Sequence, residues 1–214
     1  MKHTIEAICT GTARPFNGAE TSAIAKHPRE GLVQFLEDGL APDEQADRRV
    51  HGGADMAVHL YPLDHHDFWR EELGANDILD LPGAFGSNLA VRGLIETDVH
   101  IGDQFRVGSA LLEISQPRKP CWKIEHRFGQ KGMVARIVKT GRSGWYFRVL
   151  EMGEAQTGDT IERVALGDLG WSVERTFAAL FGGKASGDDL PQLAELEPLS
   201  PYIREKIQEA IAPK

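Results

Sequence analysis

Short apolar runs, separated by Gly, Pro and Asp, occupy most of the first 165 residues. Runs of about four to eight residues bounded by turn-forming residues are typical of β-strands, and many of them in succession favour a barrel or a sandwich. The clearest pair is residues 104–107 and 110–114. They flank Gly108-Ser109, a two-residue turn suited to positive φ at its first position. Further strands are predicted over residues 3–10, 22–26, 32–37, 56–61, 87–91 and 145–150.

Two helical segments interrupt these strands. Pro62, followed by acidic residues, is typical of a helix start and predicts a helix over residues 62–73. A second helix is predicted over residues 133–139, because its apolar residues fall on one face and Gly141 follows its end.

Helix signals with explicit caps dominate after about residue 166. The predicted starts are Ser172 for residues 173–181, Asp188 or Asp189 for residues 190–196, and Ser200-Pro201 for residues 202–212. We therefore expect a mainly β fold with helices: a β-barrel domain over residues 1–165 and a small three-helix domain over residues 166–214. A unit of about 45 residues rarely folds alone, so we expect it to dock on the barrel.

Composition places the chain among globular proteins that do not span membranes. Of its 214 residues, 41% are hydrophobic and 26% are charged. No apolar segment follows the first Met, and no apolar run approaches the roughly 20 residues that a bilayer span needs. We expect a cytoplasmic protein with no membrane partner. The net charge of −8 argues against a nucleic-acid partner, which would require a basic face.

The segment 114–123, ISQPRKPCWK, contains one of the two cysteines. Three cationic residues near Cys121 in sequence favour a thiolate, and two prolines stiffen the loop. A thiolate is both a nucleophile and a soft metal ligand, while an inert buried thiol is the alternative. Cys9 lies in a strand-like stretch and is expected in the core; a disulfide between the two is not expected without a secretory signal.

Upstream, residues 43–59 form a dense polar stretch that contains Gly52-Gly53. Arg48, Arg49 and His51 are suitable donors for a phosphate, so the stretch is either an anion or cofactor pocket or a solvated loop.

Four histidines, His51, His59, His65 and His66, match no common zinc pattern. His65 and His66 are expected on the exposed face of their helix. A cysteine hydrolase or transferase needs a base near Cys121, and His126 is expected to point away from the loop. A persulfide carrier would use the same cationic loop.

Several motifs occur in an order that resembles the MOSC family, named for the molybdenum cofactor sulfurase C-terminal domain, and specifically its YiiM-like branch. The resemblance covers residues 3–165, and the helical tail is similar to the C-terminal three-helix domain of that branch. The motifs are SAIAK at 22–26, the acidic stretch 43–47 with HGG at 51–53, FGSNL at 85–89, IGD at 101–103 and SQPRKPC at 115–121.

The resemblance implies a β-barrel that binds molybdenum cofactor (molybdenum–molybdopterin), a pyranopterin dithiolene that carries a phosphate. Cys121 is then the metal ligand and catalytic residue. The residues implied around the pterin and its phosphate are Lys26, His51, Asn88, Ser115 and Arg118. One departure from the branch is Ala41-Pro42 before Asp43, where a Gly is usual.

The implied activity is reduction of small N-hydroxylated compounds such as 6-hydroxylaminopurine, from N–OH to N–H, as a detoxification. No Rossmann glycine pattern follows a strand, so electrons are expected from an external flavoprotein donor. The alternative is a non-redox MOSC protein that carries sulfur, as a persulfide, or the cofactor itself.

Overall fold

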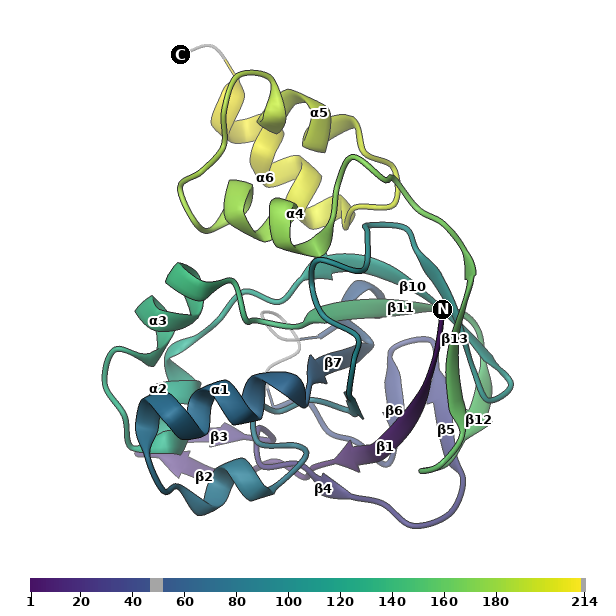
Figure 1. The fold of residues 1–214 in the computed structure, drawn as a ribbon, viewed down its shortest axis with the longest axis vertical. Helices are drawn as coiled ribbons and strands as arrows, with labels where there is room; N and C mark the ends of the chain where they lie inside the picture. Colours follow the sequence, from purple (N-terminus) through teal and green to yellow (C-terminus); the bar gives the residue numbers. More distant parts are fainter. Residues whose placement is uncertain (47–51, 213–214) are drawn as a thin grey trace.

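Seven strands form a closed barrel (Figure 1). The structure is a computed structural model that describes residues 1–46 and 52–212. Around the barrel the strands follow the order β13 (Thr160–Ala165), β9 (Gln104–Val107), β10 (Ala110–Pro117), β11 (Trp145–Glu151), β7 (Val58–Pro62), β8 (Leu89–Val91) and β1 (Lys2–Thr10). Pairing of β1 with β13, with Lys2 opposite Glu162, closes the ring. The β7–β8 pair is parallel and the other barrel pairs are antiparallel.

Apolar side chains from alternate strand positions fill the barrel. Phe105, Leu112 and Phe147 are fully buried there, and the rings of Phe105 and Phe147 meet edge to face with centroids 5.7 Å apart. Shorter strands lie outside the ring. These are β4 (His27–Pro28) beside β1, the hairpin of β2 (Arg14–Asn17) and β3 (Glu20–Ser22), and a sheet of β12 (Gly153–Ala155), β5 (Val33–Leu36) and β6 (Gly39–Ala41).

Three helices pack together on one side of the barrel (Figure 1): α1 (Asp64–Leu73), α2 (Trp122–Phe128) and α3 (Met133–Thr140). Of two short 3₁₀ helices, η2 (Asp77–Asp80) lies beside α1, whereas η1 (Ala54–Met56) lies against β10 and β11. A second apolar cluster fills the space between helices and barrel, and in it Tyr61 stacks on Phe85 with ring centroids 4.1 Å apart. Over the two described stretches of chain, no helix is long and apolar enough to cross a membrane.

The last three helices, α4 (Val173–Leu180), α5 (Asp189–Glu195) and α6 (Pro201–Ile211), lie together at one end of the barrel (Figure 1). Their apolar residues share one continuous cluster with the barrel interior, and Phe177 of α4 joins the cluster under α1 to α3. The amide of Ser200 also donates to the carbonyl of Ser115 on β10 at 3.0 Å. The tail is thus packed on the barrel, while its description as a separate domain from residue 166 stays a prediction.

The barrel and the predicted hairpin are confirmed. Gly108 has φ of 55° at the turn between β9 and β10, as the two-residue turn requires. The helix stop at Gly141 is confirmed by its φ of 74°, and the cap at Ser172 by its side chain, which accepts a hydrogen bond from the amide of Arg175 at 3.1 Å.

The strand predicted over residues 22–26 is wrong, because β3 ends at Ser22 and the next four residues leave the sheet. The amide of Lys26 donates to the carbonyl of Ile24 at 3.1 Å, which bends the chain within three residues. This bend lies so close to Gly11 that a Cβ there would be 2.8 Å from the carbonyl oxygens of Ala23 and Ala25. Tertiary contact with the residue that follows β1 therefore overrides the apolar pattern.

The predicted exposure of His65 and His66 is also wrong. Both are buried, with 6% and 2% of their surfaces exposed, because this face of α1 packs onto the second apolar cluster. Nδ1 of His66 lies 2.9 Å from the carbonyl oxygen of Leu79, and Nε2 of His65 lies 2.6 Å from a carboxylate oxygen of Glu96. Each imidazole finds a buried polar partner.

Candidate functional site

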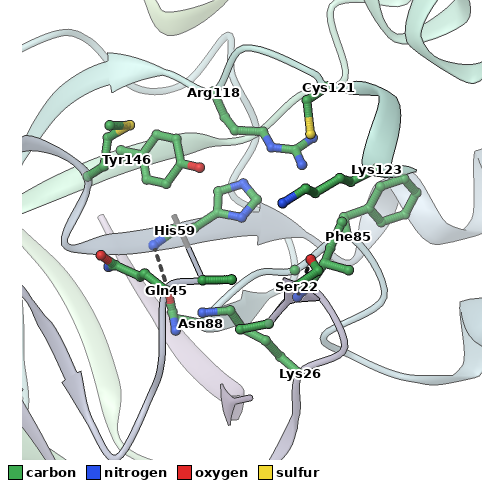
Figure 2. Close-up of a pocket in the computed structure, with 15 residues that line it drawn as sticks. Ser22, Lys26, Gln45, His59, Phe85, Asn88, Arg118, Cys121, Lys123 and Tyr146 are labelled. Atoms are coloured by element: carbon green, nitrogen blue, oxygen red, sulfur yellow. Dashed lines mark hydrogen bonds between the residues drawn. The ribbon is translucent and has the colours of Figure 1, made fainter. Parts of the chain in front are cut away.

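A pocket opens at one end of four neighbouring strands, β10, β11, β7 and β8 (Figure 2). Its empty space is about 630 Å³, including the part that is open to solvent. Residues from six separate stretches of the chain line it: Ser22, Ala23, Ile24, Lys26, Gln45, Ala46, Met56, His59, Phe85, Gly86, Asn88, Arg118, Cys121, Lys123 and Tyr146. Strand register explains the grouping, since Gln116 pairs with Tyr146 and Tyr146 pairs with His59.

Cys121 lies where the chain passes from β10 into α2. It has extended backbone angles and directly precedes the first helical residue, and its carbonyl accepts from the amide of Ile124 at 3.1 Å. The thiol is partly buried at the pocket wall, and it is not joined to Cys9 in a disulfide. Figure 2 shows the sulfur facing the same space as the guanidinium of Arg118 and the ammonium of Lys123.

Arg118 is a buried cation whose Nη1 has no hydrogen-bond partner within the described part of the chain. Only 6% of its surface is exposed, and its backbone amide donates to the carbonyl of Gly144 at 3.0 Å. A buried guanidinium nitrogen without a partner carries a free-energy cost that an anionic ligand would offset. Arg118 therefore has the burial and the spare donor of an anion-binding residue.

His59 lies beside Arg118 on β7 and is 3% exposed. Burial, and then the positive charge of Arg118, lower the pKa of His59 well below its usual value, so the ring is neutral at pH 7. Its Nε2 likewise has no partner among residues 1–46 and 52–212. The ring of Tyr146 packs against it with centroids 5.1 Å apart. Burial raises the pKa of Tyr146, so its phenol keeps its proton.

The floor of the pocket is a buried polar network centred on Asp43. One carboxylate oxygen of Asp43 accepts from Nζ of Lys26 and, at 2.8 Å, from Nδ2 of Asn88. The other oxygen accepts from the amide of Gly11 at 2.8 Å. Burial lowers the pKa of Lys26 and the charge of Asp43 opposes that shift. Asn88 also accepts from the amide of His59 at 3.1 Å, so the floor and the wall of the pocket are linked.

The pocket gathers positive charge in a chain whose net charge is negative. Lys26, Arg118 and Lys123 line it, and no carboxylate is found among its described lining residues. The same two stretches hold no group of three or more His, Cys, Asp or Glu side chains that could bind a metal ion.

Four of the predicted site residues, Lys26, Asn88, Arg118 and Cys121, meet in this pocket. Ser115 does not line it: its hydroxyl lies 2.6 Å from the carbonyl oxygen of Asp55 and thus ties β10 to η1. His51 lies outside the described residues.

Sequence reasoning missed His59 and Tyr146 as pocket residues, and it gave no separate site role to Phe85, Lys123 and Asp43, although these three lie in the motifs quoted above. His59 had one signal, a polar residue inside the apolar run VHLY at 58–61. His126 is confirmed to be directed elsewhere, with Nε2 2.8 Å from the carbonyl oxygen of Phe16.

Comparison with known proteins identifies the fold around this pocket. The family model of the MOSC domain matches residues 47–162. The chain belongs to the MOSC domain family. Protein YiiM of Escherichia coli is 36% identical over 165 residues, which span 77% of this chain and 73% of that protein. A protein of Gibberella moniliformis named Reductase is 40% identical over 157 residues, 73% of this chain but only 28% of the fungal protein.

Solved structures extend the likeness along the whole chain. The crystal structure of YiiM from Geobacillus stearothermophilus superposes with a TM-score of 0.82 at 29% identity, covering 99% of this chain and 100% of that one. The barrel and the helical tail thus both have counterparts in that YiiM structure, as the YiiM-like motifs predicted.

Proposed function

We propose that the protein binds molybdenum cofactor in this pocket and reduces N-hydroxylated compounds such as 6-hydroxylaminopurine. One observation carries the proposal: in a MOSC domain, the Cys121 thiol lies in the same pocket as buried nitrogen atoms of Arg118 and His59. These two nitrogen atoms have no hydrogen-bond partner among the described residues. The family takes its name from a molybdenum cofactor sulfurase, and the fungal relative is named a reductase.

The residues present fit the chemistry of that cofactor. A molybdenum ion held by dithiolene sulfurs accepts a soft thiolate, which Cys121 supplies. A terminal phosphate needs cations and N–H donors, which Arg118 and Lys123 supply. Within the described residues, Nη1 of Arg118 has no hydrogen-bond partner, so it can donate to the phosphate.

The remaining polar lining suits the hydrogen-bonding edge of a pterin. An ammonium has three N–H bonds and Asp43 occupies one, so Lys26 keeps donors for a ligand. His59, neutral and buried, is added here to the binding residues, and His51 is proposed with them by its motif position. Ser115 contributes indirectly, by holding η1 against β10.

Reduction of N–OH to N–H consumes two electrons and two protons and releases water. The bound cofactor would supply the two-electron chemistry, recharged by an external flavoprotein donor. The chain supplies orientation. Tyr146 lines the pocket with a phenol that burial keeps protonated, so we assign it as a hydrogen-bond donor to the substrate.

The test is made on protein produced in a cofactor-competent host. Molybdenum content per chain and reduction of 6-hydroxylaminopurine are measured for the wild type, Cys121→Ala and Cys9→Ala. We expect Cys121→Ala to abolish reduction, whereas Cys9→Ala, which alters a buried thiol on β1, keeps molybdenum and activity. Full activity of Cys121→Ala would contradict the assignment of the metal ligand.

The same protein distinguishes the carrier alternative. Sulfur label on Cys121 in protein that holds no molybdenum and reduces no substrate would replace the reductase by a persulfide carrier. Arg118→Ala tests the phosphate contact: loss of a hydrogen bond to a charged group, about 1.5–3 kcal/mol, should weaken cofactor retention on dialysis by roughly tenfold or more. Unchanged molybdenum content would refute that contact.

A further inference from the structure

Glu96 is a buried carboxylate outside the pocket. Its surface is 4% exposed, and three groups bond to its side chain. One carboxylate oxygen accepts from the amides of Ser143 and Gly144, at 3.0 and 2.7 Å, and the other lies 2.6 Å from Nε2 of His65. An ionised carboxylate in such a place is tolerated because donors surround it. In return, the carboxylate holds in place the chain segments that donate these hydrogen bonds.

The amides of Ser143 and Gly144 belong to the turn that connects α3 to β11, so Glu96 holds this turn in place. The turn contacts the pocket at two points. The carbonyl of Gly144 accepts the backbone amide of Arg118 at 3.0 Å, and a Cβ at Gly144 would lie 3.0 Å from Nε2 of His59. The turn requires Gly144, whose φ is 70° and whose missing side chain would collide with the carbonyl oxygen of Leu60. The turn therefore packs directly against Arg118 and His59.

Glu96 is itself held from two sides. His65 comes from α1, and the backbone carbonyl of Glu96 accepts the amide of Glu174 in the first turn of α4 at 3.1 Å. One residue thus connects the helical tail and α1 to the turn behind Arg118. Glu96 can act on Arg118 through this turn without lining the pocket itself.

We propose that Glu96 is a positioning residue that holds Arg118 and His59 in place through the turn at residues 143–144. This proposal rests on the proposed function only for the identity of the ligand that Arg118 contacts. The positioning of Arg118 and His59 is a property of the ligand-free protein. Without the carboxylate, two buried amides lose their acceptor, so the turn moves and the Arg118 amide loses its partner.

Asp103 provides a matched control. It is also a fully buried carboxylate and accepts from two backbone amides, those of His100 at 3.0 Å and Gly167 at 2.7 Å. Its cationic partner is Arg163 at 2.9 Å. These contacts join the barrel to the start of the tail, and none of them involves a residue that lines the pocket.

The deciding measurement is amide hydrogen exchange of cofactor-free protein. In Glu96→Ala we expect exchange at Ser143, Gly144 and Arg118 to accelerate by about tenfold or more, as for loss of a bond to a charged group. Asp103→Ala should leave these three amides within about threefold of the wild type. Unchanged exchange at Arg118 in Glu96→Ala, or equal acceleration in Asp103→Ala, overturns the proposal.

Two further variants keep the test sharp. Glu96→Gln retains an oxygen acceptor for both amides and should restore wild-type exchange, which a role for the charge alone would not allow. Glu96→Asp, one methylene shorter, should accelerate exchange in the same direction, and it replaces Glu96→Ala if that variant does not fold. Failure of both expectations overturns the proposal.

A double-mutant cycle links positioning to binding. Glu96→Ala should lower retained molybdenum in the wild-type background and have a smaller effect in Arg118→Ala, where only its action through His59 remains, because residues that act through one another are not additive. An equal added loss in both backgrounds means that Glu96 does not act through Arg118. If Arg118→Ala alone retains all molybdenum, the proposed binding role of Arg118 fails, while the exchange result still decides the role of Glu96.

Discussion

Replacing Asp43 by Ala should strongly destabilise the fold. The Asp43 side chain is 2% exposed and that of Lys26 is 10% exposed. The substitution removes the acceptor of Lys26, Asn88 and the amide of Gly11 together. Removing one partner of a buried ion pair costs about 3–5 kcal/mol, because the other charge stays buried without compensation. Since small domains are stable by roughly 5–15 kcal/mol, a large share of the folding free energy is at stake.

Urea unfolding followed by tryptophan fluorescence measures this loss. Lys26→Met in the Asp43→Ala background removes the stranded ammonium and should recover about 1–3 kcal/mol, since apolar replacements of buried pairs are often well tolerated. Asp77→Ala, at an exposed position of η2, should change stability by less than about 0.5 kcal/mol. A loss below about 1 kcal/mol for Asp43→Ala at unchanged m-value, or a double variant no more stable than the single one, would refute the reasoning.

Three further outcomes are expected. Burial lowers the folded-state pKa of His59 and His66 below the unfolded value of about 6.5, so as pH falls below 6.5 only the unfolded chain binds these protons. The free energy of unfolding should therefore fall, by at most about 1.4 kcal/mol per pH unit for each histidine, and a flat urea profile from about pH 8 to pH 5 would contradict this. Ser172→Ala should cost about 1 kcal/mol by thermal unfolding, because the cap bond of α4 is lost; an unchanged melting temperature argues against the cap. A thiol reagent at about pH 8 should modify one cysteine in native protein and two in denaturant, because Cys121 lies at the pocket wall whereas Cys9 is fully buried and burial raises its pKa to about 12. Modification of both in native protein would refute that difference.

Local signals located most of the barrel. The hairpin around Gly108 and the helix end at Gly141 depend on backbone conformations that glycine favours, so the sequence around them sufficed. Residues 22–26 could not be assigned in this way, because their bend follows from close contact with Gly11, which lies in a different part of the chain. The predicted exposure of His65 and His66 was wrong for a related reason, because their burial depends on what α1 packs against.

The site was predictable where a motif carried it. Motif order brought Lys26, Asn88, Arg118 and Cys121 into one pocket, although no local pattern implies their proximity. His59 and Tyr146 were missed because they meet only through the register between β7 and β11, and strand register is not visible in either strand alone.

Closure of the barrel also sets the order of events during synthesis. Residues 2–4 of β1 pair with residues 160–162 of β13. The hydrogen-bonded pairing of the first strand can therefore be completed only after most of the chain has been synthesised. Cys9 near the other end of β1 accepts from Asn88 at 3.2 Å through its carbonyl, which places the pocket floor on that same strand. Domains fold as units during translation. The barrel that carries the pocket can therefore close only after residue 162 has been synthesised.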